Sequence, residues 1–212
     1  MREAGSINCM RRSPLTLCLF VLTVTSTIAE EPKESPPPPP PLEAQLAIPF
    51  TIARGKTTRV IVRGRTLDQI TSVEASSAAV TATIIEKGEA KLPEGWKAEQ
   101  LGDRQVTIDV AVAEAFAADT VKLNLRSDSE ATDIDLAIVP SEVLVDEKEP
   151  NRGFKDAQPL KLGSTVLGTI GSNKDVDVYR IDQAPTPSTA RIHIDIIARR
   201  CGSALDPVLT VY

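Results

Sequence analysis

The sequence has few cysteine, histidine and aromatic residues. It contains 3 cysteines, 1 histidine and 3% aromatic residues in 212 positions. Cys9 and Cys18 lie in the first 29 residues, so a chain that loses this segment keeps only Cys201 and cannot form an intramolecular disulfide. A structural zinc site made of cysteine and histidine is excluded for the same reason. Stability must come from apolar cores or bound ions, and we expect Cys201 to be a buried free thiol, with intermolecular pairing as the alternative.

The scarcity of histidine also limits catalysis. His193 is the only histidine, so any triad of nucleophile, histidine and acid would have to use it. It lies in the alternating stretch RIHIDII (191–197), on the same side as Arg191 and Asp195, which predicts a half-buried strand with its isoleucines inside. Ser203 lacks the Gly-x-Ser-x-Gly elbow of hydrolases, so we expect a turn there. The sequence therefore predicts no active site within this chain.

The only long apolar run lies near the N-terminus. LTLCLFVLTV (15–24) follows Arg11 and Arg12 and precedes the small residues Thr27 and Ala29. The run is shorter than the roughly 20 residues of a membrane span, and the pattern is typical of a secretory signal peptide at 1–29. Cleavage after Ala29 leaves 183 residues (212 − 29). We expect a secreted protein, or one of the periplasm or cell envelope, with no membrane insertion of the mature chain.

The charge balance is acidic. The formal net charge of −5 becomes about −7 when the signal peptide is removed, because that segment carries three arginines and Glu3. Nucleic-acid binding needs a basic surface, so it is excluded as the main function, and so is adsorption to anionic membranes. Residues 30–46 include six consecutive prolines, Pro36–Pro41. This composition predicts a disordered, extended linker that acts as a spacer.

Alternation with period two dominates residues 47–140. Short alternating segments separated by Gly, Pro, Asp and Ser predict an antiparallel β-sandwich. The stretch from Ala53 to Ile84 resembles the opening of an immunoglobulin-like module of bacterial secreted proteins, in which a strand ends in a Gly-x-x-Leu turn, here Gly64-Arg65-Thr66-Leu67. The strands are predicted at 57–64, 80–85, 104–112, 120–127 and 132–139.

A second β-rich region is predicted at 141–212. EKEPNRGFKDAQPLKLGSTVLGTIGSNKDVDVYRID (147–182) and RIHIDIIARRCGSALDPVLTVY (191–212) resemble the bacterial pre-peptidase C-terminal domain, a jelly-roll-like β-sandwich appended to secreted proteases and collagenases. The whole chain is then all-β, with two sandwich modules behind a signal peptide and a polyproline spacer. The last residues end inside a predicted strand, so we expect an incomplete second sandwich, continued by a downstream domain of the same gene or completed by a partner strand.

Two acidic pairs in this region predict a cation site. Glu147 and Glu149 are two positions apart and share a side of an extended chain, Asn151 continues that side, and Asp175 and Asp177 form a second pair. Carboxylate and amide oxygens are ligands that calcium prefers. The family resemblance implies that these segments meet around a structural calcium. The alternative is a solvated acidic edge, with Asp175 and Asp177 capping a turn.

One residue departs from the family pattern. The family often has an acidic residue after the asparagine, whereas this chain has Arg152, whose charge would oppose a nearby metal ion or replace part of its charge. The sequence as a whole favours a secreted, non-catalytic protein that binds or spaces, with an extracellular protein or polysaccharide as its partner. The alternative is an N-terminal accessory fragment of a larger secreted peptidase or other hydrolase.

Overall fold

The structure is a computed structural model that describes residues 40–92, 94–172, 174–182 and 191–212. The predicted signal peptide (1–29) and the first part of the proline-rich linker lie outside these ranges. Within them, nearly all regular structure is β-strand, which confirms the prediction of an all-β protein. No helix in this described part of the chain is long and apolar enough to cross a membrane.

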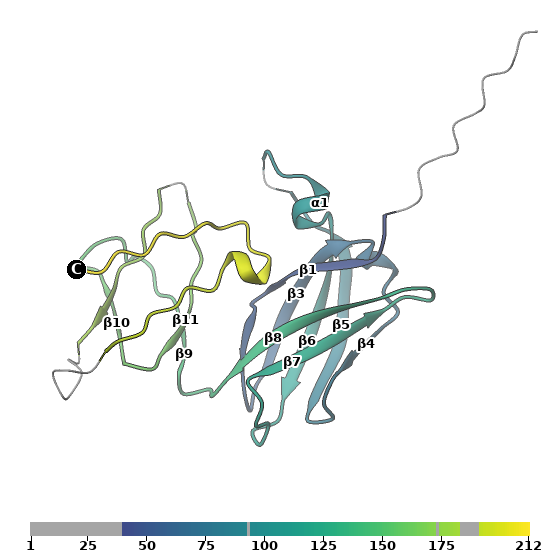
Figure 1. Ribbon diagram of the computed structural model, residues 1–212, viewed down its shortest axis with the longest axis horizontal. Coiled ribbons are helices and arrows are strands. Elements are labelled where there is room, and N and C mark those ends of the chain that lie inside the picture. The colour runs from purple at the N-terminus through teal and green to yellow at the C-terminus, as the bar shows by residue number, and fades with distance from the viewer. Residues whose placement is uncertain (1–39, 93, 173, 183–190) are drawn as a thin grey trace, which may run out of the picture. The chain divides into compact units, whose positions relative to one another are not determined.

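Two four-stranded sheets form a sandwich in the first part of the described chain (Figure 1). One sheet has the order β1-β3-β6-β5, and all its neighbouring strands are antiparallel. The other has the order β2-β8-β7-β4, in which only β2 and β8 are parallel. The strands are β1 (Glu43–Ile48), β2 (Thr51–Ala53), β3 (Thr57–Arg65), β4 (Ser72–Ala75), β5 (Val80–Glu89), β6 (Arg104–Val112), β7 (Thr120–Arg126) and β8 (Ala131–Val139).

This strand order is the one that immunoglobulin-type sandwiches have. If β1 and β2 are taken as two halves of the first strand, the sheets correspond to the ABED and GFC arrangement of that fold. All five strands predicted from the alternating pattern form, and β5 runs further than predicted, to Glu89. The single α-helix of the described residues, α1 (Ala98–Leu101), lies between β5 and β6.

The alternating residues form the core between the two sheets. Val106, Ile108 and Val110 of β6 are fully buried, and so are Leu123 and Leu125 of β7. Every second side chain of a strand points to the same face, so this pattern places one apolar side of each strand against the opposite sheet. At about 25 cal/mol per Å² of apolar area, such burial is the main stabilising force of the sandwich.

The sandwich begins earlier than predicted. The linker was expected to extend to residue 46, but β1 starts at Glu43, and Leu42 and Leu46 are buried in the described structure. These two leucines contribute apolar area to the sandwich, and this burial stabilises β1 directly after the proline run. Close packing of β1 on β3 also requires Gly64, because a Cβ atom at this position would collide with the carbonyl oxygen of Glu43.

The second part of the described chain holds short parallel strand pairs instead of a complete sandwich. β9 (Leu144–Asp146) pairs with β11 (Thr165–Leu167), and β10 (Gln158–Leu160) pairs with β12 (Tyr179–Ile181). The 3-10 helix η2 (Arg199–Cys201) follows. Cys201 forms no disulfide among the described residues and is half-buried, where a buried thiol was predicted. Its thiol donates a hydrogen bond to the carbonyl oxygen of Ala198 at 2.9 Å.

The predicted strand at 191–197 is wrong. These residues are neither helix nor strand, and Ile192, Ile194 and Ile196 have exposed fractions of 44%, 43% and 41%. Alternation buries the apolar side of a strand only where a second layer covers that side. Among the described residues, no neighbouring strand pairs with this segment, so its isoleucines remain half in solvent.

Candidate metal centre

Three carboxylates converge between β9 and β12. Glu147 directly follows β9, Glu149 stands two positions further on, and Asp177 lies two positions before β12. One side-chain oxygen of each lies within 4.8 Å of those of the other two. The backbone N–H of Glu147 also donates to the carbonyl oxygen of Leu167, so the pairing of β9 with β11 fixes this end of the cluster. Three carboxylates at such a spacing suit a hard cation that takes oxygen ligands.

Glu147 accepts three hydrogen bonds. Its Oε1 accepts from the hydroxyl of Tyr179 at 2.6 Å and from Nδ2 of Asn151 at 3.1 Å, while its Oε2 accepts from the backbone N–H of Thr169 at 2.7 Å. Burial alone would raise the pKa of Glu147, but these donors stabilise the ionised form, and the net effect lowers the pKa below the usual 4.5. Glu147 is therefore a fixed anion at the centre of the cluster.

The hydroxyl of Tyr179 stays protonated because it donates to the ionised carboxylate of Glu147. Its burial and its hydrogen bond to Glu147 both raise the pKa of the phenol above the usual 10.0. The hydroxyl is thus a permanent donor that orients the carboxylate of Glu147 toward the cluster.

The surroundings of Asp177 disfavour its ionised form. Burial, followed by the nearby charges of Glu147 and Asp175, raises the pKa of Asp177 from 3.8 to about 6. Its Oδ1 is buried and has no hydrogen-bond partner among the described residues. A carboxylate in this position gains from any cation that enters the cluster, because the cation removes the repulsion and supplies the missing partner.

Asn151 gives a separate indication of a missing ligand. Its side chain is fully buried, its Nδ2 donates to Glu147, and its backbone N–H donates to Oε2 of Glu149 at 3.1 Å. Its Oδ1 has no hydrogen-bond partner in the described part of the chain. A buried amide oxygen without a partner costs free energy of about 1–3 kcal/mol. Amide oxygens are a ligand type that calcium takes, and the same amide group already contacts Glu147 of the cluster through Nδ2.

The loop that carries these ligands is held by polar contacts. The backbone N–H of Val178 donates to the carbonyl oxygen of Asn151 at 2.8 Å, which ties the loop to the approach of β12. The buried Gln158 donates to the carbonyl oxygen of Asp146 at 3.0 Å and accepts from the backbone N–H of Lys148 at 2.8 Å. Backbone groups on both sides of Glu147 are thereby fixed.

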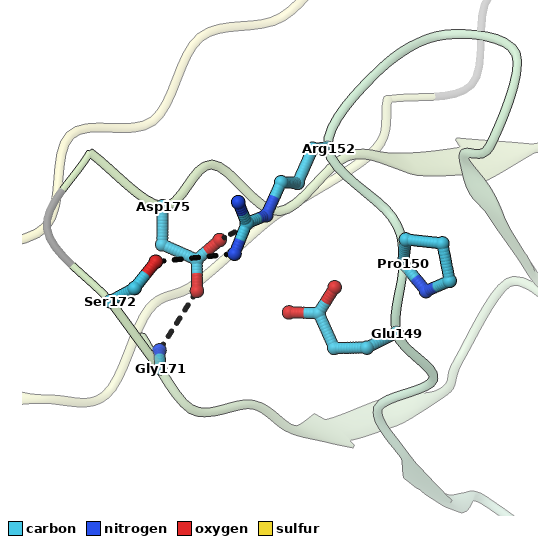
Figure 2. Close-up of a pocket in the computed structure, with 6 residues that line it drawn as sticks. All are labelled: Glu149, Pro150, Arg152, Gly171, Ser172 and Asp175. Atoms are coloured by element: carbon cyan, nitrogen blue, oxygen red, sulfur yellow. Dashed lines mark hydrogen bonds and ion pairs between the residues drawn. The ribbon is translucent and has the colours of Figure 1, made fainter.

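Asp175, the fifth predicted ligand, is not part of the converging cluster. Its Oδ1 lies 3.0 Å from Nε of Arg152, and its Oδ2 accepts from the backbone N–H of Gly171 at 2.8 Å (Figure 2). A terminal nitrogen of Arg152 also donates to Oγ of Ser172 at 3.1 Å. The structure therefore brings four of the five predicted ligands together and places the fifth in an ion pair.

Sequence reasoning missed Tyr179, Thr169 and Gln158. Tyr179 was detectable, because it follows Asp177 by two positions in the stretch DVDVY and so shares its side on an extended chain. Thr169 contributes through its backbone N–H, and Gln158 accepts a hydrogen bond from Lys148, a residue ten positions away in the sequence. No pattern of residue types marks either contact.

Comparison with known proteins does not assign the chain to a family. No protein-family model matches it, and a search of curated proteins gives no significant match.

Proposed function

We propose that the chain is a secreted, non-catalytic binding or spacing protein built of β-sandwich modules, whose second module takes up a structural calcium ion. The ligands are the carboxylates of Glu147, Glu149 and Asp177 and the side-chain oxygen of Asn151. Secretion is supported by the N-terminal sequence, and a binding partner would be an extracellular protein or polysaccharide. Calcium of extracellular fluids would supply the ion.

The observation that carries this proposal is the buried amide of Asn151. An acidic cluster alone is common on protein surfaces and needs no ion. Here, however, a fully buried side-chain oxygen without a partner accompanies three carboxylates within 4.8 Å of one another. Oxygen donors of both kinds are what calcium binds, and magnesium fits such an all-protein cage less well.

A second observation concerns what stabilises this region. Its buried residues in the described structure are Asn151, Ala157, Gln158 and Ala198, whereas the large buried apolar side chains belong to the first sandwich. A region with so little apolar core needs another source of stability, and metal binding adds its free energy to folding when the site forms only in the folded state.

Thermal unfolding of the full chain in EDTA and in about 5 mM calcium tests the proposal. For a dissociation constant near 10⁻⁴ M, typical of extracellular sites, calcium should stabilise the protein by about 2 kcal/mol. This corresponds to roughly 4–8 °C in Tm. The variant D177N should lose most of this increase, whereas D128N, in an exposed turn of the first sandwich, should retain it. An identical Tm with and without calcium would refute the calcium site.

The alternative is an accessory part of a larger secreted peptidase or other hydrolase. What supports it is the likeness of residues 147–182 to the pre-peptidase C-terminal domain, including the stretch DVDVY that supplies Asp177 and Tyr179. The calcium site would have the same stabilising role in that setting. Sequencing the transcript beyond the codon for Tyr212 distinguishes the two, because only the alternative requires a catalytic domain in the same reading frame.

A further inference from the structure

The ion pair of Arg152 and Asp175 lies beside the candidate metal centre. Arg152, Asp175 and Glu149 line the same open hollow of about 560 Å³, together with Pro150, Gly171 and Ser172 (Figure 2). The carboxylate side chain of Asp175 is only 1% exposed, while the side chain of Arg152 is 59% exposed. The arginine thus reaches in from solvent to neutralise a buried charge.

The charge balance of this region explains the need for the arginine. Glu147, Glu149, Asp175 and Asp177 bring four negative charges into one small region if all are ionised, and a divalent ion would neutralise only part of them. A buried carboxylate without a partner is strongly destabilising, so Asp175 requires a cation of its own. The guanidinium of Arg152 stays charged at all physiological pH values and meets that requirement without a metal.

The same guanidinium opposes a metal ion. A positive charge beside the ligands repels an incoming dication, and it engages the carboxylate oxygen that would otherwise be free to turn toward that ion. We infer that Arg152 is an internal counter-cation that keeps Asp175 out of the ligand set and thereby lowers the affinity of the site for calcium. This inference rests on the calcium site of the proposed function.

Two properties of the pair support this role. Asp175 is engaged on both oxygens: its Oδ1 forms an ion pair with Arg152 without a hydrogen bond of regular geometry, and its Oδ2 accepts from the backbone N–H of Gly171. The charge of Asp175 is thus balanced without a metal ion. A terminal nitrogen of Arg152 donates a hydrogen bond to Oγ of Ser172, which helps to orient the guanidinium. The charge of Arg152 therefore lies in the same hollow as Glu149. Loss of the arginine would leave Asp175 as an additional anion at the edge of the cluster.

Calcium titration calorimetry on the full chain and on the variant R152A tests this inference. We expect R152A to bind calcium roughly 5- to 10-fold more tightly, the order that Coulomb's law gives for a unit charge one side-chain length from a dication in water-like surroundings. R152K, which keeps the charge, should bind within about twofold of the wild type. R59A removes an arginine whose ion pair with Asp109 lies in the first sandwich, so it changes the net charge equally and should leave the affinity unchanged.

The outcomes separate this inference from the proposed function. Equal or weaker calcium binding by R152A, with binding by the wild type, overturns the role of Arg152 and leaves the calcium site intact. Absence of binding in every variant overturns both. Binding by R152A alone supports the role of Arg152 and refutes calcium binding by the native chain. Should R152A fail to fold, R152Q keeps hydrogen-bond donors for Asp175 and Ser172 without the charge, and the same comparison applies.

Discussion

Replacement of Asp177 by asparagine should stabilise the calcium-free protein at neutral pH. In the folded chain, burial and the charges of Glu147 and Asp175 raise the pKa of Asp177 from 3.8 to about 6. At 1.36 kcal/mol per pH unit this corresponds to about 3 kcal/mol of destabilisation above pH 6. Solvent screens part of it, so we expect a gain of about 1–2 kcal/mol for D177N in EDTA at pH 7.

The sign of the effect depends on pH. Below pH 3.8 the aspartate is protonated in both the folded and the unfolded chain, so the variant gains nothing from removal of the charge. Between pH 3.8 and about 6 the unfolded chain loses its proton first, and the stability contributed by the protonated side chain falls as the pH rises. The advantage of D177N should therefore appear across this interval and stay constant above it. Calcium should reverse the order at pH 7, because only the wild type retains the carboxylate ligand.

Urea unfolding of both proteins in EDTA, at pH values from about 3.5 to 8, measures this difference. Taking the difference between variant and wild type removes the pH dependence of groups that do not interact with Asp177. D128N serves as the control for loss of an exposed carboxylate, and its difference curve should be flat. A D177N curve that is flat as well, or a variant less stable than the wild type in EDTA at pH 7, would refute the electrostatic reasoning.

The remaining predictions concern one hydrogen bond and one close backbone contact. Y179F removes the donor to Glu147, so it should raise the pKa of that carboxylate and lower the calcium-free stability by about 1–2 kcal/mol in urea unfolding. Y212F, at a residue that is 93% exposed, is the control. Equal stability of the two variants would contradict the role of Tyr179. G64A should destabilise the first sandwich by about 1–3 kcal/mol, because the new Cβ meets the carbonyl oxygen of Glu43. G88A, where a Cβ would meet nothing within 4 Å, should change the urea midpoint little, and a similar loss in both variants would argue against the contact of β1 with Gly64.

Much of the first sandwich could be predicted because its signal is local. Alternation in stretches such as RQVTIDVAV specifies both a strand and the side that is buried, and β6 forms with these bounds. The start of β1 was missed, since Leu42 and Leu46 follow a run of prolines and their burial depends on sheets formed by distant residues. The segment 191–197 has the same alternation but no partner strand in the described structure. Local pattern thus predicts a strand well only where tertiary pairing completes it.

The part of the candidate site that could be predicted is the part whose ligands are close together in the sequence. Glu147 and Glu149 are two positions apart, and that spacing alone brings them to one side of the chain. The separation of Asp175 from Asp177 was not predictable in this way, because the same spacing would place them together. In the structure Asp175 pairs with Arg152 and stays out of the converging cluster. The charge of Arg152 is visible in the sequence, but its partner is not.

The two parts of the described chain depend on different forces, and this difference links the site to a stabilising function. The first sandwich buries a continuous apolar core, whose stability changes little with pH or ions. Among the described residues of the second part, the fully buried side chain is Asn151, and Glu147, directly after β9, is joined to β12 by the hydroxyl of Tyr179. Polar contacts of this kind contribute modestly on their own, because water competes for each partner. An ion that binds the same groups adds its binding free energy to the stability of this part of the fold. The carboxylates repel one another without calcium, and with calcium bound they would stabilise the region as its ligands.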